Sequence, residues 1–151
     1  MQMILKQKVY DHFLQALQEK IRRLQTALAE LKESSSNETK STAGDKHETA
    51  LAMLQIEQAN INSQLHDLLE KRSVMEKINP AIVSITVVNG SLVNTSRGYL
   101  FISIASGKAV IDGVNVTSLS SRSPLGAKIM GLSRGDRVEI QNTAYIILSI
   151  E

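Results

Sequence analysis

The sequence contains no cysteine, which excludes disulfide bonds, thiolate metal sites and catalysis by a thiol nucleophile. Aromatic residues make up only 3% of the chain, so neither an aromatic-lined pocket nor a base-stacking platform is expected. No apolar run approaches the roughly 18 residues that a membrane-spanning helix needs, and the N-terminus lacks the apolar core of a signal peptide. These absences predict a soluble, cytoplasmic protein with no membrane partner.

The chain also has little net charge. It carries 17 basic and 15 acidic residues, for a formal charge of +2. This balance does not indicate a nucleic-acid-binding protein. The length of 151 residues leaves room for one ordinary domain, or for a long helical hairpin followed by a small globular unit.

What the sequence does contain is a pair of heptad ladders between about Met3 and Met75. Apolar residues spaced alternately by four and three predict two long helices that pack on each other. If the chain reverses near residue 41, the ladders pair in a register that places Leu31 opposite Leu51 and Ile21 opposite Ile61. We therefore expect residues 1–78 to form an antiparallel coiled coil with its tip at about residues 34–48, far from the rest of the protein. The ladders are Tyr10, Leu14, Leu17, Ile21, Leu24, Leu28 and Leu31 in the first helix, and Leu51, Leu54, Gln58, Ile61, Leu65, Leu68, Arg72 and Met75 in the second.

Local signals set the expected helix ends. The first helix should run from near Met3 to about Lys32, because residues 34–44 are rich in Ser, Thr, Asn and Gly. Asp45 can cap the second helix, with Glu48 three residues on in an arrangement close to a capping box. Thr42 offers a second possible cap. Asn79-Pro80 should stop this helix near Lys77 and mark the domain boundary.

From Ala81 onward the apolar period changes to two, which indicates strands. A short helix is predicted between them, with Ser123 as its N-cap, Pro124 in its first position and Gly131 just past its end. Residues 81–151 are thus expected to form a small antiparallel β domain with one helix, and the whole chain belongs to the α+β class. The expected strands are Ile82–Val88, Gly98–Ala105, Lys108–Ile111, Arg137–Gln141 and Ala144–Ile150.

Taken together, these pieces resemble the bacterial Gre-type transcript cleavage factors, which are transcription elongation factors. The tip sequence Gly44-Asp45-Lys46-His47-Glu48 is similar to the family's Gly-Asp-x-x-Glu motif. The run from Ser123 to Gly131, followed by Gly135-Asp136-Arg137-Val138, is similar to the family's Ser-Pro and Gly-Asp-x-Val run. The resemblance covers nearly the whole chain.

The resemblance implies that residues 81–151 have a fold like that of the FK506-binding proteins and dock on bacterial RNA polymerase, with Ser123, Pro124, Leu125 and Asp136 near the contact. The coiled coil would enter the secondary channel and reach the 3′ end of the nascent RNA. There Asp45 and Glu48 would help to retain a second Mg²⁺, and the polymerase itself would cleave backtracked RNA. The chain would then be a monomeric accessory factor rather than an enzyme, with no cofactor bound stably alone.

Each of these residues also has a simpler interpretation. Helix capping alone, worth about 1 kcal/mol, accounts for Asp45 and Glu48. Lys20, Arg22 and Arg23 form a basic patch, which is either a solvated helix face or a contact with an RNA or DNA strand.

The chain departs from the family pattern after Glu48. The family continues Asn-Ala-Glu-Tyr, whereas this chain has Thr49-Ala50-Leu51-Ala52. A polymerase modulator or inhibitor of the same architecture that does not promote cleavage is therefore an alternative function. A prolyl isomerase is a third hypothesis, but those enzymes use an aromatic pocket, and residues 81–151 contain only Tyr99, Phe101 and Tyr145.

Overall fold

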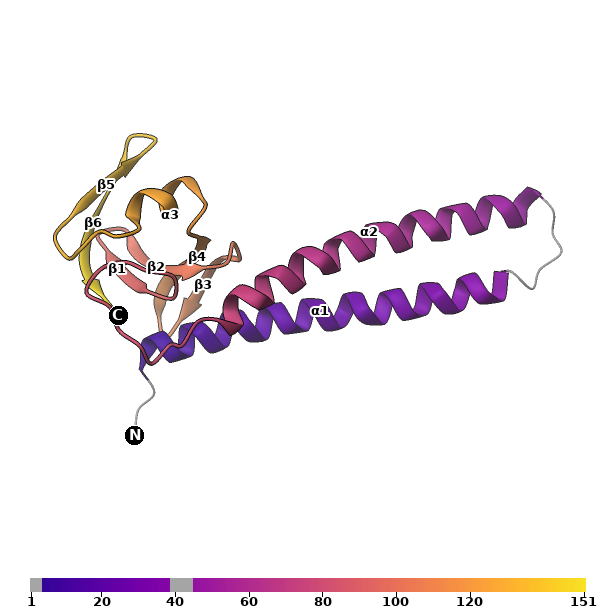
Figure 1. Ribbon diagram of the computed structural model, residues 1–151, viewed down its shortest axis with the longest axis horizontal. Coiled ribbons are helices and arrows are strands. Elements are labelled where there is room, and N and C mark those ends of the chain that lie inside the picture. Colours follow the sequence, from indigo (N-terminus) through magenta and orange to yellow (C-terminus); the bar gives the residue numbers. More distant parts are fainter. Residues whose placement is uncertain (1–3, 39–44) are drawn as a thin grey trace. The chain divides into compact units, whose positions relative to one another are not determined.

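The computed structural model describes residues 4–38 and 45–151, except the side chains of residues 38 and 45–47. Two long helices are followed by a six-stranded sheet domain with one short helix (Figure 1). The chain divides into two compact units. One unit combines Met1–Gln15 with Ser73–Glu151, and the other is Ala16–Arg72. The start of the first long helix and the end of the second thus belong to the same unit as the sheet domain. The domain boundary expected at Asn79-Pro80 stays a prediction.

The two long helices are α1, Leu5–Glu38, and α2, Asp45–Glu76. The start of α2 and its end, one residue before the expected position, agree with the sequence analysis. The predicted end of α1 near Lys32 was wrong, because the helix continues through Ser34, Ser35, Ser36 and Asn37. These residues are only mediocre helix formers and do not break a helix as proline does. No helix in the described ranges is long and apolar enough to span a membrane.

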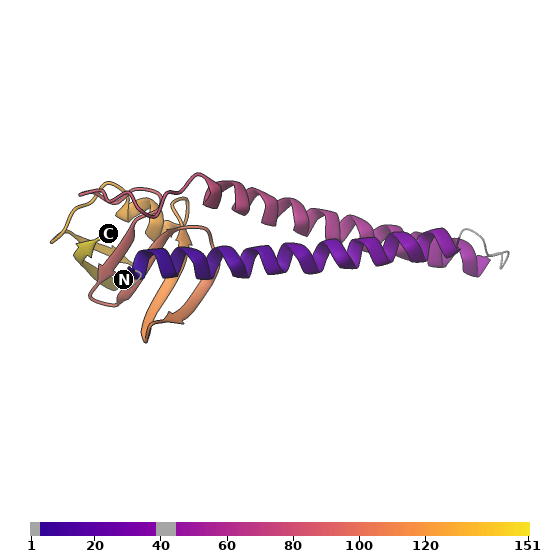
Figure 2. The same cartoon turned by 90° about the horizontal axis from the view of Figure 1, so that it is seen from below.

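In the unit Ala16–Arg72, the two helices run antiparallel (Figure 2). The predicted ladders face inward, since every ladder residue of this unit is buried or half-buried. Leu17, Ile21 and Leu65 are the buried ones, at 3%, 3% and 7% exposure. The heptad pattern therefore identified the packed face of each helix.

The predicted register between these helices was wrong. Leu31 lines a groove together with Glu57 and Ile61, whereas the sequence-based pairing placed Ile61 opposite Ile21. Ile61 is thus offset by about ten residues, or three steps of the ladder, a slip that keeps both apolar ladders facing each other. Equal heptad spacing on both helices cannot distinguish between two such alignments.

The six strands form one sheet in the order β3-β4-β2-β1-β6-β5. All neighbouring pairs are antiparallel except β2 and β4, which are parallel. The sheet is therefore mixed, which corrects the expectation of a purely antiparallel domain. The strands are β1 Leu92–Thr95, β2 Gly98–Ser103, β3 Gly107–Ile111, β4 Val114–Ser120, β5 Arg137–Ile140 and β6 Thr143–Ile150, and the short helix α3 is Pro124–Ile129.

The sequence analysis failed for three strands of the β domain, because one predicted strand is absent and two observed strands were not predicted. Ile82–Val88 is not a strand, and only Thr86 forms an isolated bridge, to Ser133. Its β-branched residues are largely exposed, with Ile85 at 89%. In contrast, β1 was not predicted, and neither was β4, which lies inside the sheet between β3 and β2. Its turn signal, Asp112-Gly113, adopts positive φ angles of 52° and 77° and closes the β3–β4 hairpin.

The core of the sheet domain lies between α3 and one face of the sheet. Ile102 and Ile129 are both completely buried there, and Leu125 packs against the edge of the cluster. The first turns of α1 belong to the same unit. There Lys6 Nζ donates a hydrogen bond to the Ile82 carbonyl oxygen at 2.6 Å, and Tyr10 Oη donates to the Met75 carbonyl oxygen at 2.9 Å.

Candidate functional site

The predicted acidic pair lies at the start of α2. Asp45 is the first residue of the helix, and Glu48 is exposed on its first turn. Residues three apart on a helix lie on the same face, so both carboxyl-bearing positions occupy one side of the helix. The proposed cap interaction of Asp45 lies outside the described side chains, as do Lys46 and His47.

Carboxylate oxygens are hard ligands of the kind that Mg²⁺ prefers. One or two of them bind this ion only weakly, because Mg²⁺ keeps most of its hydration shell. Among the side chains that the structure describes, no group of three His, Asp or Glu residues is placed to hold a metal ion. The donor type at Asp45 and Glu48 fits a Mg²⁺ ion that another protein also ligates.

Ser123 and Pro124 build the start of α3, as the sequence predicted. Ser123 Oγ accepts a hydrogen bond from Gly126 N at 3.0 Å and donates one to the Ser120 carbonyl oxygen at 2.7 Å. Pro124 takes the first helical position, where its missing N–H costs nothing. These hydrogen bonds stabilise the start of α3, and they hold Pro124 and Leu125 at the surface.

Asp136, the fourth predicted docking residue, has a local role in a turn. Its carboxylate accepts a hydrogen bond from Ser133 N at 2.8 Å, and its own backbone N–H donates to the Ser133 carbonyl oxygen. Asp136 is not among the residues that line a groove with Ser123, Pro124 and Leu125. The structure thus brings three of the four predicted docking residues together and leaves Asp136 apart.

The groove beside α3, which we call the α3 groove, has a volume of about 620 Å³. Strands β2, β3 and β4 supply its floor, and α3 and the ends of the β1–β2 and β5–β6 hairpins supply its walls. Sequence reasoning missed this site, because its residues come from six separate segments of the chain. The lining residues are Arg97, Tyr99, Leu100, Lys108, Asn115, Thr117, Leu119, Ser123, Pro124, Leu125, Ile140, Gln141 and Tyr145.

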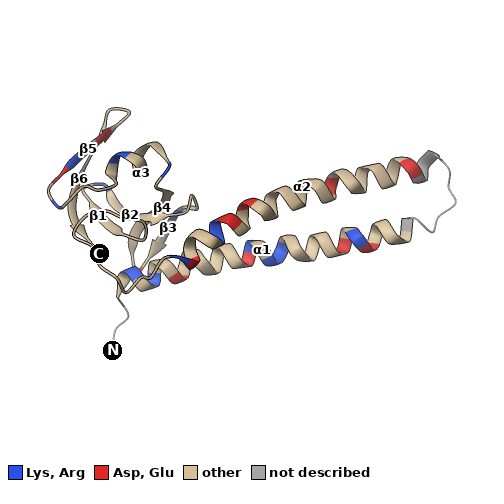
Figure 3. Cartoon of the chain, viewed as in Figure 1, with Lys and Arg blue, Asp and Glu red and all other residues tan. Residues whose placement is uncertain are grey.

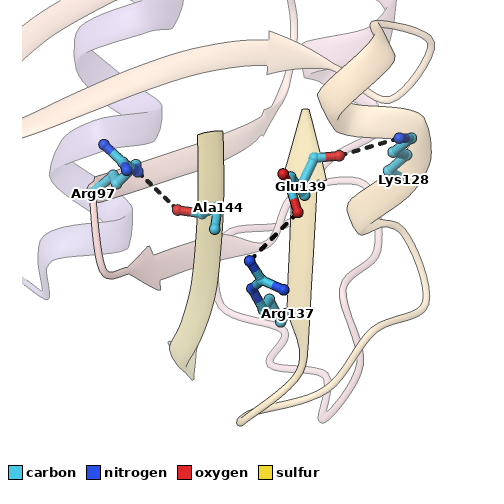
Figure 4. Close-up of polar contacts among 5 residues, drawn as sticks. All are labelled: Arg97, Lys128, Arg137, Glu139 and Ala144. Carbon is cyan, nitrogen blue, oxygen red and sulfur yellow. Dashed lines mark hydrogen bonds and ion pairs between the residues drawn. The ribbon is translucent and has the colours of Figure 1, made fainter. Parts of the chain in front are cut away.

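Polar contacts hold the rim of the α3 groove (Figure 4). Arg97 Nε donates a hydrogen bond to the Ala144 carbonyl oxygen at 2.7 Å, and its guanidinium carbon lies 6.0 Å from the centroid of the Tyr145 ring. The Lys128 ammonium reaches the Glu139 carbonyl oxygen at 3.1 Å, and the Glu139 carboxylate reaches Arg137 at 3.4 Å.

The basic patch of α1 is partly neutralised within the helix. Arg22 and Arg23 both contact Glu19, at 2.6 Å and 3.3 Å. The hydrogen bond from Arg22 lowers the pKa of the Glu19 carboxyl. Lys20 instead lines a groove between the helices, near Asp67 of α2. Acidic and basic residues are interspersed along α1 (Figure 3), so the three predicted cations do not form one continuous positive face.

No family model matches the sequence, and no curated protein does either. Among solved structures, the chain is similar to one described as the structure of the transcription factor Gfh1. The two are 14% identical, the alignment covers 91% of this chain and 92% of that chain, and the TM-score is 0.36. This degree of likeness does not assign a function.

Proposed function

We propose that this protein is an accessory factor of bacterial RNA polymerase that acts in the cytoplasm and stimulates cleavage of backtracked RNA by the polymerase. The observation that carries the proposal is the placement of Asp45 and Glu48 on the first turn of α2, beside the connection of an antiparallel helical hairpin. This arrangement matches the motif order of the Gre-type family that the sequence resembles. The sheet domain, with Pro124 and Leu125 at its surface, would supply the docking site.

Two carboxylates bind Mg²⁺ only weakly by themselves, so the proposed cleavage chemistry needs metal ligands from the polymerase as well. In a two-metal site, one ion activates the attacking water and the other stabilises the leaving oxygen. The polymerase's own aspartates would hold one Mg²⁺ firmly. Asp45 and Glu48 would add oxygen ligands for the second, completing a site that neither protein builds by itself. The nascent RNA 3′ end would be the substrate, and a monomer of this chain would suffice.

A second candidate is a modulator that enters the channel without promoting cleavage. It is favoured by Leu51, which stands where the family has a second tip glutamate and is half-buried on the packed face of α2. An apolar side chain in that position cannot ligate a metal ion.

Two measurements on the same complexes separate these candidates. Binding of the intact chain to core polymerase tests both, because each requires docking. Shortening of RNA 3′ ends in stalled elongation complexes tests only the first. Binding without shortening would replace the cleavage factor by the modulator, and absence of binding would reject both.

A further inference from the structure

We infer that the α3 groove binds an acidic segment of a partner protein, and that Arg97 and Lys108 recognise its carboxylates. The inference rests on the proposed function, in which the partner is RNA polymerase. The inference is based on the positive charge of the residues that line the groove. Two cations from separate elements, Arg97 between β1 and β2 and Lys108 on β3, line it, and no acidic residue does.

Three of the four acidic residues of the sheet domain have partners outside the groove, and the fourth, Glu151, does not line it. Asp112 pairs with Lys8 at 2.7 Å, and the Glu139 carboxylate pairs with Arg137 at 3.4 Å. The Asp136 carboxylate is bonded to a backbone N–H within its own turn. The described lining of the groove therefore holds two cations and no carboxylate, which favours an anionic partner.

Arg97 is positioned in advance of binding. Its Nε is bonded to the Ala144 carbonyl oxygen, and its guanidinium lies by the Tyr145 ring, so only part of its donor capacity is used. A guanidinium with its orientation fixed loses less conformational entropy when it binds a carboxylate. Lys108 is exposed on the edge strand β3 and would act as a mobile point charge.

The other residues that line the α3 groove indicate which class of anionic partner it fits. Leu119 is 8% exposed, Leu125 is half-buried, and Pro124 is exposed beside them. This apolar wall suits a segment that presents an apolar side chain next to its acidic ones, as protein interfaces do. A nucleic acid would instead favour a longer row of cations that follows the phosphates. Two of the residues that the sequence analysis assigned to docking, Pro124 and Leu125, belong to this wall.

The test uses the full-length chain and purified core RNA polymerase, which contains neither DNA nor RNA. Affinity is measured at about 50 mM and 300 mM salt for the intact chain, for Lys108→Glu and for Arg97→Gln. The matched control is Arg134→Glu, an equal change of charge at an exposed position that does not line the groove. Thermal unfolding of Arg97→Gln checks that loss of the Ala144 bond has not unfolded the rim.

We expect Lys108→Glu to weaken binding about 10-fold at low salt and Arg97→Gln about 3- to 5-fold, because a single exposed ion pair contributes little and a reversal of charge adds repulsion. Both differences should shrink at high salt, and the control should change affinity less than about twofold.

Three outcomes would overturn the inference. If Lys108→Glu and Arg134→Glu weaken binding equally, the groove is not the site, while the proposed function stands. If Lys108→Glu weakens binding to an elongation complex but not to core polymerase, the groove takes nucleic acid. If the intact chain does not bind core polymerase at either salt concentration, the proposed function fails, and the inference fails with it.

Discussion

The rings of Phe13 and Phe101 stack with their centroids 6.2 Å apart and their planes inclined by 22°. Phe13 lies on α1 and Phe101 on β2, and they are 2% and 0% exposed. They therefore join residues 88 positions apart in the sequence inside one compact unit.

Phe13→Ala should lower the free energy of unfolding by about 3 to 5 kcal/mol, since it removes a fully buried ring and leaves a cavity. Urea unfolding followed by circular dichroism measures the loss. Phe13→Leu is the control, because it keeps most of the apolar volume and should cost less than half as much. A loss below about 1 kcal/mol for Phe13→Ala would show that this ring pair does not anchor the helix.

Gly126→Ala should destabilise the protein, although alanine favours helices by about 1 kcal/mol over glycine. A Cβ at this position would lie well inside van der Waals contact with the Ser120 carbonyl oxygen and close to Ser123 Oγ. We expect a net loss of about 1 to 3 kcal/mol from this overpacking. The measurement is the urea midpoint, with Ala127→Gly on the exposed side of the same helix as a control for propensity alone. A raised midpoint for Gly126→Ala would contradict the close approach.

Stability should depend on pH through Lys6. Burial lowers the pKa of this ammonium below its ordinary value of 10.5, and the nearby Glu151 opposes the shift. Between the lowered pKa and 10.5, the unfolded chain binds more protons than the folded one, so the free energy of unfolding rises with pH. Below this window the cost of burying the charge is fully present.

Lys6→Met removes the titrating group, so its stability should rise less between pH 7 and pH 10 than that of the intact chain. Urea unfolding at several pH values in this range measures both curves. Tyr10 is present in both proteins, and its contribution cancels in the difference. Parallel curves would show that Lys6 has the same pKa in the folded and unfolded states.

The sequence predicted those features that depend on local chemistry. Ser123, Pro124 and Gly131 marked both ends of α3 correctly, because caps and positive φ angles restrict residue type directly. The heptad ladders identified the buried faces of α1 and α2 for a similar reason. Helix caps and heptad patterns each depend only on the sequence of one segment.

The failures concern features that depend on partners distant in the sequence. Ile82–Val88 has strand-forming residues but forms only an isolated bridge, and β4 takes its place inside the sheet by pairing with both β2 and β3. The heptad ladders do not encode the register of α1 against α2. The α3 groove, with Arg97 and Lys108 from different hairpins, is likewise a product of the sheet order.

RNA cleavage in backtracked elongation complexes is the most direct measurement of the proposed role of Asp45 and Glu48. The intact chain, the Asp45→Ala, Glu48→Ala double variant and the control Glu57→Ala, an exposed acid further along α2, are compared at equal occupancy of the polymerase. The account predicts that the intact chain and the control shorten the RNA at the same rate, and that the double variant binds normally but is about 10- to 100-fold slower, the usual cost of disturbing a metal site. A double variant that shortens the RNA as fast as the intact chain would contradict the account.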